Sequence, residues 1–207
     1  MGKKSFVNFL TFVRAPLVLA GAVCALCHAW HASRLEWLMA TFVLMGLSAL
    51  TDLFDGMLAR RWQVTSALGA LADPLMDKVF YVVTLPVAVF LAMKNGDVGH
   101  AVVLLILTIV SLLRDQWVSF LRSIGVMYGA DVKANWAGKL RTAVGFPIIV
   151  VIYLVLGVQA HGAWLKPSIW VVLLVFEVAL ILLTLLSAWI YTVEYRNFLK
   201  KAMQDRP

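Results

Sequence analysis

The sequence predicts an all-α, polytopic membrane protein with six transmembrane helices in one bundle. Of its 207 residues, 62% are hydrophobic and only 14% are charged, whereas a soluble domain carries about 25% charged residues. Apolar runs of about 20 residues, the length that crosses roughly 30 Å of hydrocarbon, recur along nearly the whole chain. The sequence contains no low-complexity linker, internal repeat or soluble-sized insertion, so we expect residues 1–207 to form a single domain.

The first apolar run, residues 7–26, follows the basic start Lys3-Lys4 and is followed by no small-residue cleavage site. We therefore interpret it as a retained span and not as a signal peptide. The later runs are bounded by charged or turn-forming residues, and tryptophans lie near many of their ends, as in membrane–water interfaces. The six predicted spans are residues 7–26, 37–58, 68–93, 101–124, 140–158 and 169–193.

Basic residues are distributed unevenly between the alternate loops of this topology. Only Arg34, Lys94 and Lys166 fall in one set of loops. The net charge of +7 is therefore concentrated on the other side, which the positive-inside rule assigns to the cytoplasm together with both termini. This pattern predicts a multi-pass protein of the cell (inner) membrane with a cytoplasmic active site, and it gives no indication of nucleic-acid binding. The residues on the basic side are Lys3, Lys4, Arg60, Arg61, Arg122, Lys133, Lys139, Arg196, Lys200, Lys201 and Arg206.

An ionised carboxylate near the centre of a spanning helix costs about 2.5 to 3.5 kcal/mol on insertion scales, yet four aspartates lie within two neighbouring spans, toward their cytoplasmic ends. On an ideal helix Asp52 and Asp55 are about 60° apart, and Asp73 and Asp77 about 40° apart, so each pair shares a face. Because a short loop joins the two spans, all four carboxylates can converge. Such a cluster repels itself unless cations neutralise it.

A cluster of oxygen ligands without histidine or cysteine favours Mg²⁺, Mn²⁺ or Ca²⁺ over zinc. Gly56, Ala59 and Gly69 lie four residues from an aspartate and leave room beside the carboxylates. Arg60 follows Gly56 by one turn, where it can meet a phosphate. The alternative is that the acids only hold helices together by pairing with a basic neighbour, for example Arg60, Arg61 or Lys78.

Written out, the segment is Asp52-Leu-Phe-Asp55-Gly56-Met-Leu-Ala59-Arg60, eight further residues, then Gly69-Ala-Leu-Ala-Asp73-Pro-Leu-Met-Asp77. It resembles the signature DxxDGxxARx8GxxxDxxxD of the CDP-alcohol phosphotransferases at every fixed position. The resemblance implies a six-helix membrane fold, usually a homodimer, with two divalent metal ions, Mg²⁺ or Mn²⁺, near the cytoplasmic surface. Paired metal ions can stabilise both the attacking and the leaving oxygens of such a displacement.

The resemblance also implies a role for each residue of the signature. Asp52, Asp55 and Asp73 would ligate metal, and Asp77 would complete the site and take the proton of the attacking hydroxyl. Asp52, Gly56, Ala59, Arg60 and Gly69 would form the site for the cytidine nucleotide, with Arg60 on its diphosphate. CMP would be the leaving group. Further candidate site residues outside the signature are Asn8, Thr11, Arg14 and Thr51.

Within the family, the sequence looks most similar to the phosphatidylglycerophosphate synthases, over roughly residues 6–145. The similar segments include Asn8 through Arg14, Arg114-Asp115 and Gly138 through Thr142, although that branch implies a glutamate in place of Asp115. The expected substrates are CDP-diacylglycerol and glycerol 3-phosphate, within a membrane of lipids. A group of basic residues is expected to bind the acceptor phosphate. These residues are Arg114, Arg122, Lys139 and Arg141.

Other functions stay open at this point. An inositol phosphate acceptor would use a similar basic pocket, and intramembrane acids also line the ion paths of transporters. Cys24-Ala-Leu-Cys27-His28 spells the attachment pattern of a c-type haem. That pattern lies in an apolar helix, which favours two core cysteines over a haem-binding redox protein.

Overall fold

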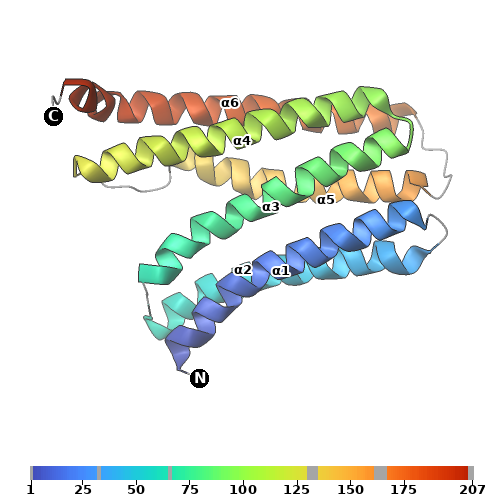
Figure 1. The fold of residues 1–207 in the computed structure, drawn as a ribbon, viewed down its shortest axis with the longest axis horizontal. Coiled ribbons are helices and arrows are strands. Elements are labelled where there is room, and N and C mark those ends of the chain that lie inside the picture. Colours follow the sequence, from blue (N-terminus) through green and yellow to red (C-terminus); the bar gives the residue numbers. More distant parts are fainter. Residues whose placement is uncertain (1, 32–33, 65–66, 130–134, 161–166, 205–207) are drawn as a thin grey trace. The chain divides into compact units, whose positions relative to one another are not determined.

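The structure is a computed structural model that describes residues 2–31, 34–64, 67–129, 135–160 and 167–204, apart from a few side chains near the start of the third helix. It is all-helical over these residues (Figure 1). The helices are α1 (Lys3–Trp30), α2 (Leu35–Trp62), α3 (Ala67–Lys94), α4 (Val98–Met127), α5 (Trp136–Ala160) and α6 (Pro167–Gln204). The six spans predicted from the apolar runs each correspond to one helix.

The helices extend beyond the apolar runs, most of all at the end of α6. The prediction ended this span at Val193, but the helix continues to Gln204. Its added residues are mainly polar, yet they include lysine, arginine, leucine, methionine and glutamine, all good helix formers. Hydropathy marks only the part of a helix in lipid, so it cannot find such an extension.

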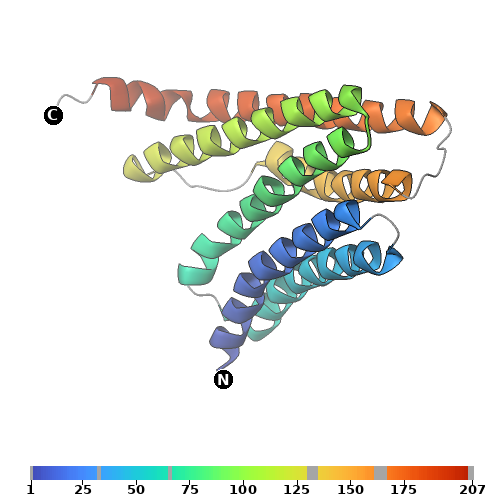
Figure 2. The ribbon, with the colours of Figure 1, turned by 45° about the vertical axis from the view of Figure 1, so that its right-hand side comes forward.

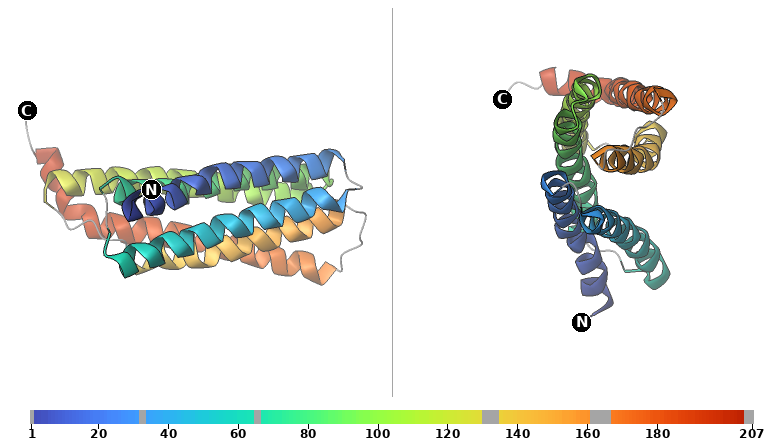
Figure 3. Two further views of the ribbon diagram at one scale, coloured as in Figure 1. Left: turned by 90° about the horizontal axis from the view of Figure 1, so that it is seen from below. Right: turned by 90° about the vertical axis from the view of Figure 1, so that its right-hand side faces the viewer.

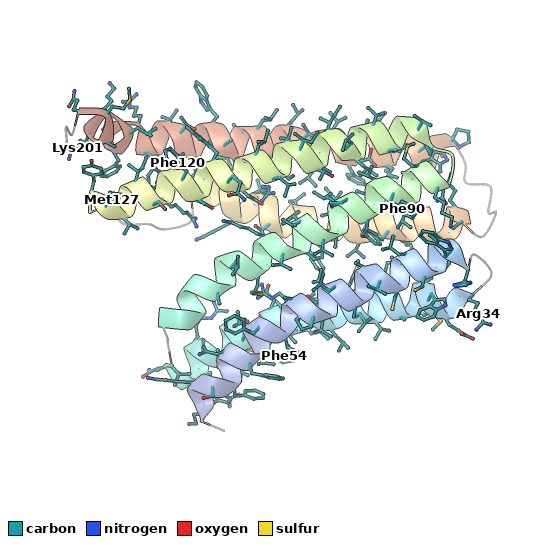
Figure 4. The ribbon with its side chains drawn as sticks, viewed as in Figure 1. Arg34, Phe54, Phe90, Phe120, Met127 and Lys201 are labelled. Atoms are coloured by element: carbon teal, nitrogen blue, oxygen red, sulfur yellow. The ribbon has the colours of Figure 1, made fainter. Side chains whose placement is uncertain are left out.

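Five of the helices in the described part of the chain, all except α3, are long and apolar enough to cross a membrane. Apolar side chains are exposed in large numbers on the described helices, α3 included, among them Phe54, Phe90 and Phe120 (labelled in Figure 4). Apolar residues on the outside of a helix are expected where lipid replaces water. The protein is therefore an integral membrane protein with several spans, as the sequence predicts.

Contacts divide the chain into two units, which we describe separately. The first comprises residues 1–101 and 153–164, and in it α1 runs beside α2 (Figure 2). The two helices are antiparallel, because Phe6 at the start of α1 lies 6.3 Å from the ring of Trp62 at the end of α2. At the opposite end Trp30 stacks on Phe90 of α3. The starts of α1 and α3 therefore lie at the same end as the last turns of α2.

The last two turns of α5 also belong to the first unit. The hydroxyl of Tyr153 donates to the carbonyl of Thr84, and the side chain of Asn95 donates to the carbonyl of Leu156. Gly157 packs so closely on α2 that a Cβ there would lie 2.4 Å from Leu38. A side chain at residue 157 would therefore have to displace the end of the Leu38 side chain.

The second unit comprises residues 102–152 and 165–207, and its helices are most of α4, the first part of α5, and α6. Views from below and from the end show α4 alongside α6 (Figure 3). Trp117 of α4 donates its indole N–H to Thr192 of α6 at 2.8 Å. A buried cluster of Val118, Leu121, Tyr191 and Tyr195 joins the two helices near this point.

Candidate active site

Two of the predicted metal ligands, Asp52 and Asp55, lie on one face of α2 and meet the same side chain of α1. The guanidinium of Arg14 forms an ion pair with Asp52, and its Nη2 lies 3.5 Å from Oδ2 of Asp55. Thr11, one turn before Arg14, donates its hydroxyl to Oδ2 of Asp55 at 2.8 Å. The expectation from helix geometry that the two carboxylates share a face is confirmed.

The two carboxylates differ in their exposure to solvent. The side chain of Asp55 is 7% exposed and that of Arg14 is 5% exposed, whereas that of Asp52 is 49% exposed. Asp55 is thus held inside the helix packing by Thr11 and Arg14, while Asp52, which also pairs with Arg14, is half exposed on the same face. Both offer hard oxygen donors, the kind that Mg²⁺ and Mn²⁺ prefer, so the described donor set fits such an ion.

Arg14 is a basic partner of both acids, and the alternative interpretation did not name it. Arg60, which it did name, is exposed and donates its Nε–H to the carbonyl of Gly56 on its own helix. The sequence does contain an indication of a polar face on α1. Thr11 and Arg14 are three residues apart in an apolar run and so share a helix face. Thr51, another candidate residue, donates its hydroxyl to the carbonyl of Ser48. Asn8 lies one turn before Thr11 on α1.

Small residues leave space beside Asp52 on the surface of α2. A Cβ built at Gly56 would meet only the tip of Arg60, at 3.8 Å. Ala59, one turn after Asp55, is partly exposed. The small residues predicted to accommodate a bulky ligand therefore leave an open helix face next to the carboxylates.

The other half of the predicted metal site lies in the first turns of α3. Gly69, Asp73 and Asp77 are in this helix, which starts at the end of the unit where Asp52 and Asp55 lie. The side chains of Asp73 and Asp77 fall outside the described residues. Among the side chains that the structure does describe, no three acidic, histidine or cysteine residues form a group. The four-carboxylate site stays a prediction.

The predicted acceptor residues lie in the second unit, and two of them are bound to Asp115. Arg141 directs Nη1 and Nη2 at the two carboxylate oxygens of Asp115, at 3.1 and 3.4 Å. Arg114 donates to the same carboxylate at 2.9 Å and to the hydroxyl of Ser187 at 2.6 Å. Asp115 is 6% exposed. The sequence left its role undecided, and in the structure it is the shared counter-ion of the buried Arg141 and the partly buried Arg114.

The remaining basic residues differ in their surroundings. Arg122 donates Nη2 to the hydroxyl of Tyr191 at 2.9 Å. Lys139 is exposed whereas Arg141 is buried, as their angular separation of about 160° on a helix predicts. Tyr191 was not identified from the sequence, since a tyrosine in an apolar span is typical of ordinary core packing.

The haem-like pattern is explained by packing. The side chain of His28 is buried, and its Nδ1 and Nε2 lie 3.3 and 3.2 Å from the carbonyl oxygens of Arg34 and Gly157. Both ring nitrogens are thus directed at the backbone of the first unit. Cys24 and Cys27 are free thiols. In this arrangement the histidine connects helices and is not presented to a haem iron.

Comparison with known proteins identifies similar chains. Residues 5–195 match the CDP-alcohol phosphatidyltransferase family. A CDP-diacylglycerol–glycerol-3-phosphate 3-phosphatidyltransferase of Cereibacter sphaeroides is 30% identical over 155 residues, which cover 75% of this chain and 66% of that protein. A probable phosphatidylglycerophosphate synthase of Mycobacterium tuberculosis is 30% identical over 159 residues, covering 77% and 70% of the two chains. No solved structure matches significantly.

Proposed function

Because the chain belongs to the CDP-alcohol phosphatidyltransferase family, we propose that it transfers a phosphatidyl group from CDP-diacylglycerol to glycerol 3-phosphate. The products are phosphatidylglycerophosphate and CMP. The observation that carries the proposal is the pair of carboxylates on α2 that Arg14 binds, one buried against Thr11 and the other half exposed. The named activities of the relatives from Cereibacter sphaeroides and Mycobacterium tuberculosis support the choice of acceptor.

Members of the family generally use divalent metal ions. We assign Asp52, Asp55, Asp73 and Asp77 to the binding of two Mg²⁺ or Mn²⁺ ions, because carboxylate oxygens are the donors that these ions select. When bound, such ions supply positive charge next to the attacking and leaving oxygens. Thr11 and Arg14 fix Asp55, so that the acidic face of α2 keeps its shape.

The chain's own groups carry the remaining roles. Asp77 accepts the proton of the acceptor hydroxyl, whose oxygen then forms a bond to the phosphorus that bears the diacylglycerol. The bond from that phosphorus to the bridging oxygen of the diphosphate breaks, and CMP leaves. Gly56, Ala59 and Gly69 leave room for the nucleotide, and the exposed Arg60 binds its diphosphate.

The acceptor's phosphate is bound by the basic group of the second unit. Three guanidinium groups and the carboxylate of Asp115 take part in the contacts of this group, and Glu194 is joined to it through Asn135. The Nε atoms of Arg114 and Arg122 are buried and have no hydrogen-bond partner in the described part of the chain. Buried donors without acceptors are unfavourable by about 1 to 3 kcal/mol each. A dianionic phosphate supplies the acceptors that they lack.

An acceptor panel tests this function. Purified protein in mixed micelles of detergent and CDP-diacylglycerol is given Mg²⁺ and one acceptor, and CMP release is measured. We expect glycerol 3-phosphate to support release far better than inositol 1-phosphate, serine or free glycerol. Arg114→Ala and Arg122→Ala should raise KM for glycerol 3-phosphate, with Lys4→Ala as an exposed control. If inositol 1-phosphate is the better acceptor, the family assignment holds and the acceptor assignment is wrong.

A further inference from the structure

Tyr191 of α6 lies at the centre of the contacts among the basic residues of the second unit. Its side chain is buried, with 1% of the residue exposed. The guanidinium carbons of Arg114 and Arg122 lie 5.3 and 5.4 Å from the centroid of its ring. Both distances are within the range of cation–π attraction, which strengthens when the partners are removed from water. One aromatic ring therefore fixes two guanidinium groups that are two turns apart on α4.

The hydroxyl of Tyr191 also takes part in hydrogen bonds. It accepts a hydrogen bond from Nη2 of Arg122 at 2.9 Å and another from the backbone N–H of Asn135 at 3.2 Å. Asn135 precedes α5, and its side chain accepts from the N–H of Gly138 and donates to Glu194 of α6. The start of α5 is thus joined to the ring that holds the two arginines.

Gly138 shows how little space surrounds the ring. A Cβ at this position would lie 2.9 Å from the hydroxyl oxygen of Tyr191 and 3.4 Å from Nη2 of Arg114. Real Cβ contacts are essentially never as short as the first of these distances. Hence α5 approaches the ring closely only because residue 138 has no side chain.

Some hydrogen-bond donors next to the Tyr191 ring have no acceptor among the described residues. The Nε–H groups of Arg114 and Arg122 are buried without a partner among the described residues. A phenol also donates its own hydrogen, and both hydrogen bonds described for the Tyr191 oxygen are ones that it accepts. Three donors on side chains in mutual contact, two of them on guanidinium groups, are what a multiply charged oxyanion requires.

We propose that Tyr191 is a positioning residue for the acceptor's phosphate, which makes the site selective for phosphorylated over unphosphorylated alcohols. This inference rests on the function proposed above. The ring sets the directions of the Arg114 and Arg122 guanidinium groups, and the hydroxyl locks Arg122 to the start of α5. Loss of the hydroxyl leaves the arginines present but less well ordered, so it weakens acceptor binding without removing any group from the carboxylate site.

Steady-state kinetics on two variants test the proposal. Tyr191→Phe keeps the ring and should raise KM for glycerol 3-phosphate by roughly three- to tenfold, with kcat and KM for CDP-diacylglycerol changed by less than about twofold. Tyr191→Leu removes ring and hydroxyl, and should raise the acceptor KM by more than about tenfold. Inorganic phosphate, used as a competitive inhibitor of the acceptor, should lose affinity in the same order. Tyr195→Phe is the matched control, one turn further along α6 in the same buried cluster.

A third variant separates positioning from a general loss of folding. Gly138→Ala should raise the acceptor KM by displacing Tyr191, and its effect should be smaller in the Tyr191→Phe background, where the oxygen that it would strike is gone. Fully additive effects, or a Tyr191→Phe enzyme with unchanged acceptor KM, would overturn the inference. These outcomes differ from failure of the proposed function, in which the unsubstituted protein releases no CMP with any phosphorylated acceptor.

Discussion

At the scale of single residues, charge compensation determines how the carboxylates of α2 are maintained. Asp55 is buried and would be unfavourable as an unpaired ion, so Arg14 and Thr11 of α1 supply the compensating contacts. Arg14 brings a positive charge to the face where metal ions are proposed to bind. Part of the stability of this helix pair therefore depends on which cation faces the two carboxylates.

Replacing Arg14 by methionine should destabilise the metal-free protein. Removal of one partner of a buried ion pair is unfavourable by about 3 to 5 kcal/mol, and we expect the lower end because Asp52 is half exposed. Thermal unfolding in detergent with a chelator measures the loss, and added Mn²⁺ should restore more stability to Arg14→Met than to the unsubstituted protein. Arg61→Met, at an exposed position of α2, is the control. Equal melting temperatures for Arg14→Met and the control in chelator would contradict this assignment.

Site residues that share one helix could be predicted from the sequence, whereas contacts between helices could not. The carboxylate pair of α2 was predicted because helix periodicity alone places Asp52 and Asp55 together. The binding of Asp115 to Arg141 depends on how α4 packs on α5, across 26 residues of sequence, and no local pattern contains that information. The contacts of Tyr191 with Arg114 and Arg122 could not be predicted for the same reason, since only the packing of α6 brings this side chain to the arginines.

At the scale of elements, hydropathy predicted the six helices but not their full lengths. Hydropathy indicates which residues contact lipid. The span that it predicts therefore ends where α6 becomes polar, although the helix continues. Close helix packing is likewise invisible to hydropathy. Gly157 of α5 packs against Leu38 of α2 with no room for a Cβ unless the Leu38 side chain moves, and this contact ties the end of α5 to α2 within the first unit.

Gly157→Ala should lower the stability of the first unit. Overpacking against Leu38 is unfavourable by about 1 to 3 kcal/mol, which outweighs a gain of roughly 1 kcal/mol in helix propensity. Thermal unfolding in detergent should show a net loss of about 1 kcal/mol, and none in a Leu38→Ala background. Gly46→Ala is the control, because a Cβ there would meet nothing within 4 Å. A loss of the same size in both glycine variants would show that the contact with Leu38 is not the cause.

At the scale of the whole molecule, the uneven distribution of basic residues predicts the orientation. Both termini and the loops after α2 and α4 should face the cytoplasm, where the nucleotide and glycerol 3-phosphate would be met. Single cysteines at Thr65 and Ala130 should resist an impermeant thiol reagent in intact cells, in a background with Cys24 and Cys27 replaced by alanine. A cysteine at Asp97 should react. The reverse labelling pattern would place the proposed active site on the outer side.

The central claim is that the acidic face of α2 and α3 supports phosphatidyl transfer. Its most direct test follows CMP and lipid product together in micelles containing CDP-diacylglycerol, glycerol 3-phosphate and Mg²⁺. We predict that phosphatidylglycerophosphate and CMP form mole for mole, and that a chelator stops both. Asp52→Asn, Asp55→Asn, Asp73→Asn and Asp77→Asn should each lower kcat by at least about a hundredfold, with the protein still inserted in the membrane. Undiminished product formation in metal-free buffer, or by these variants, would contradict the account.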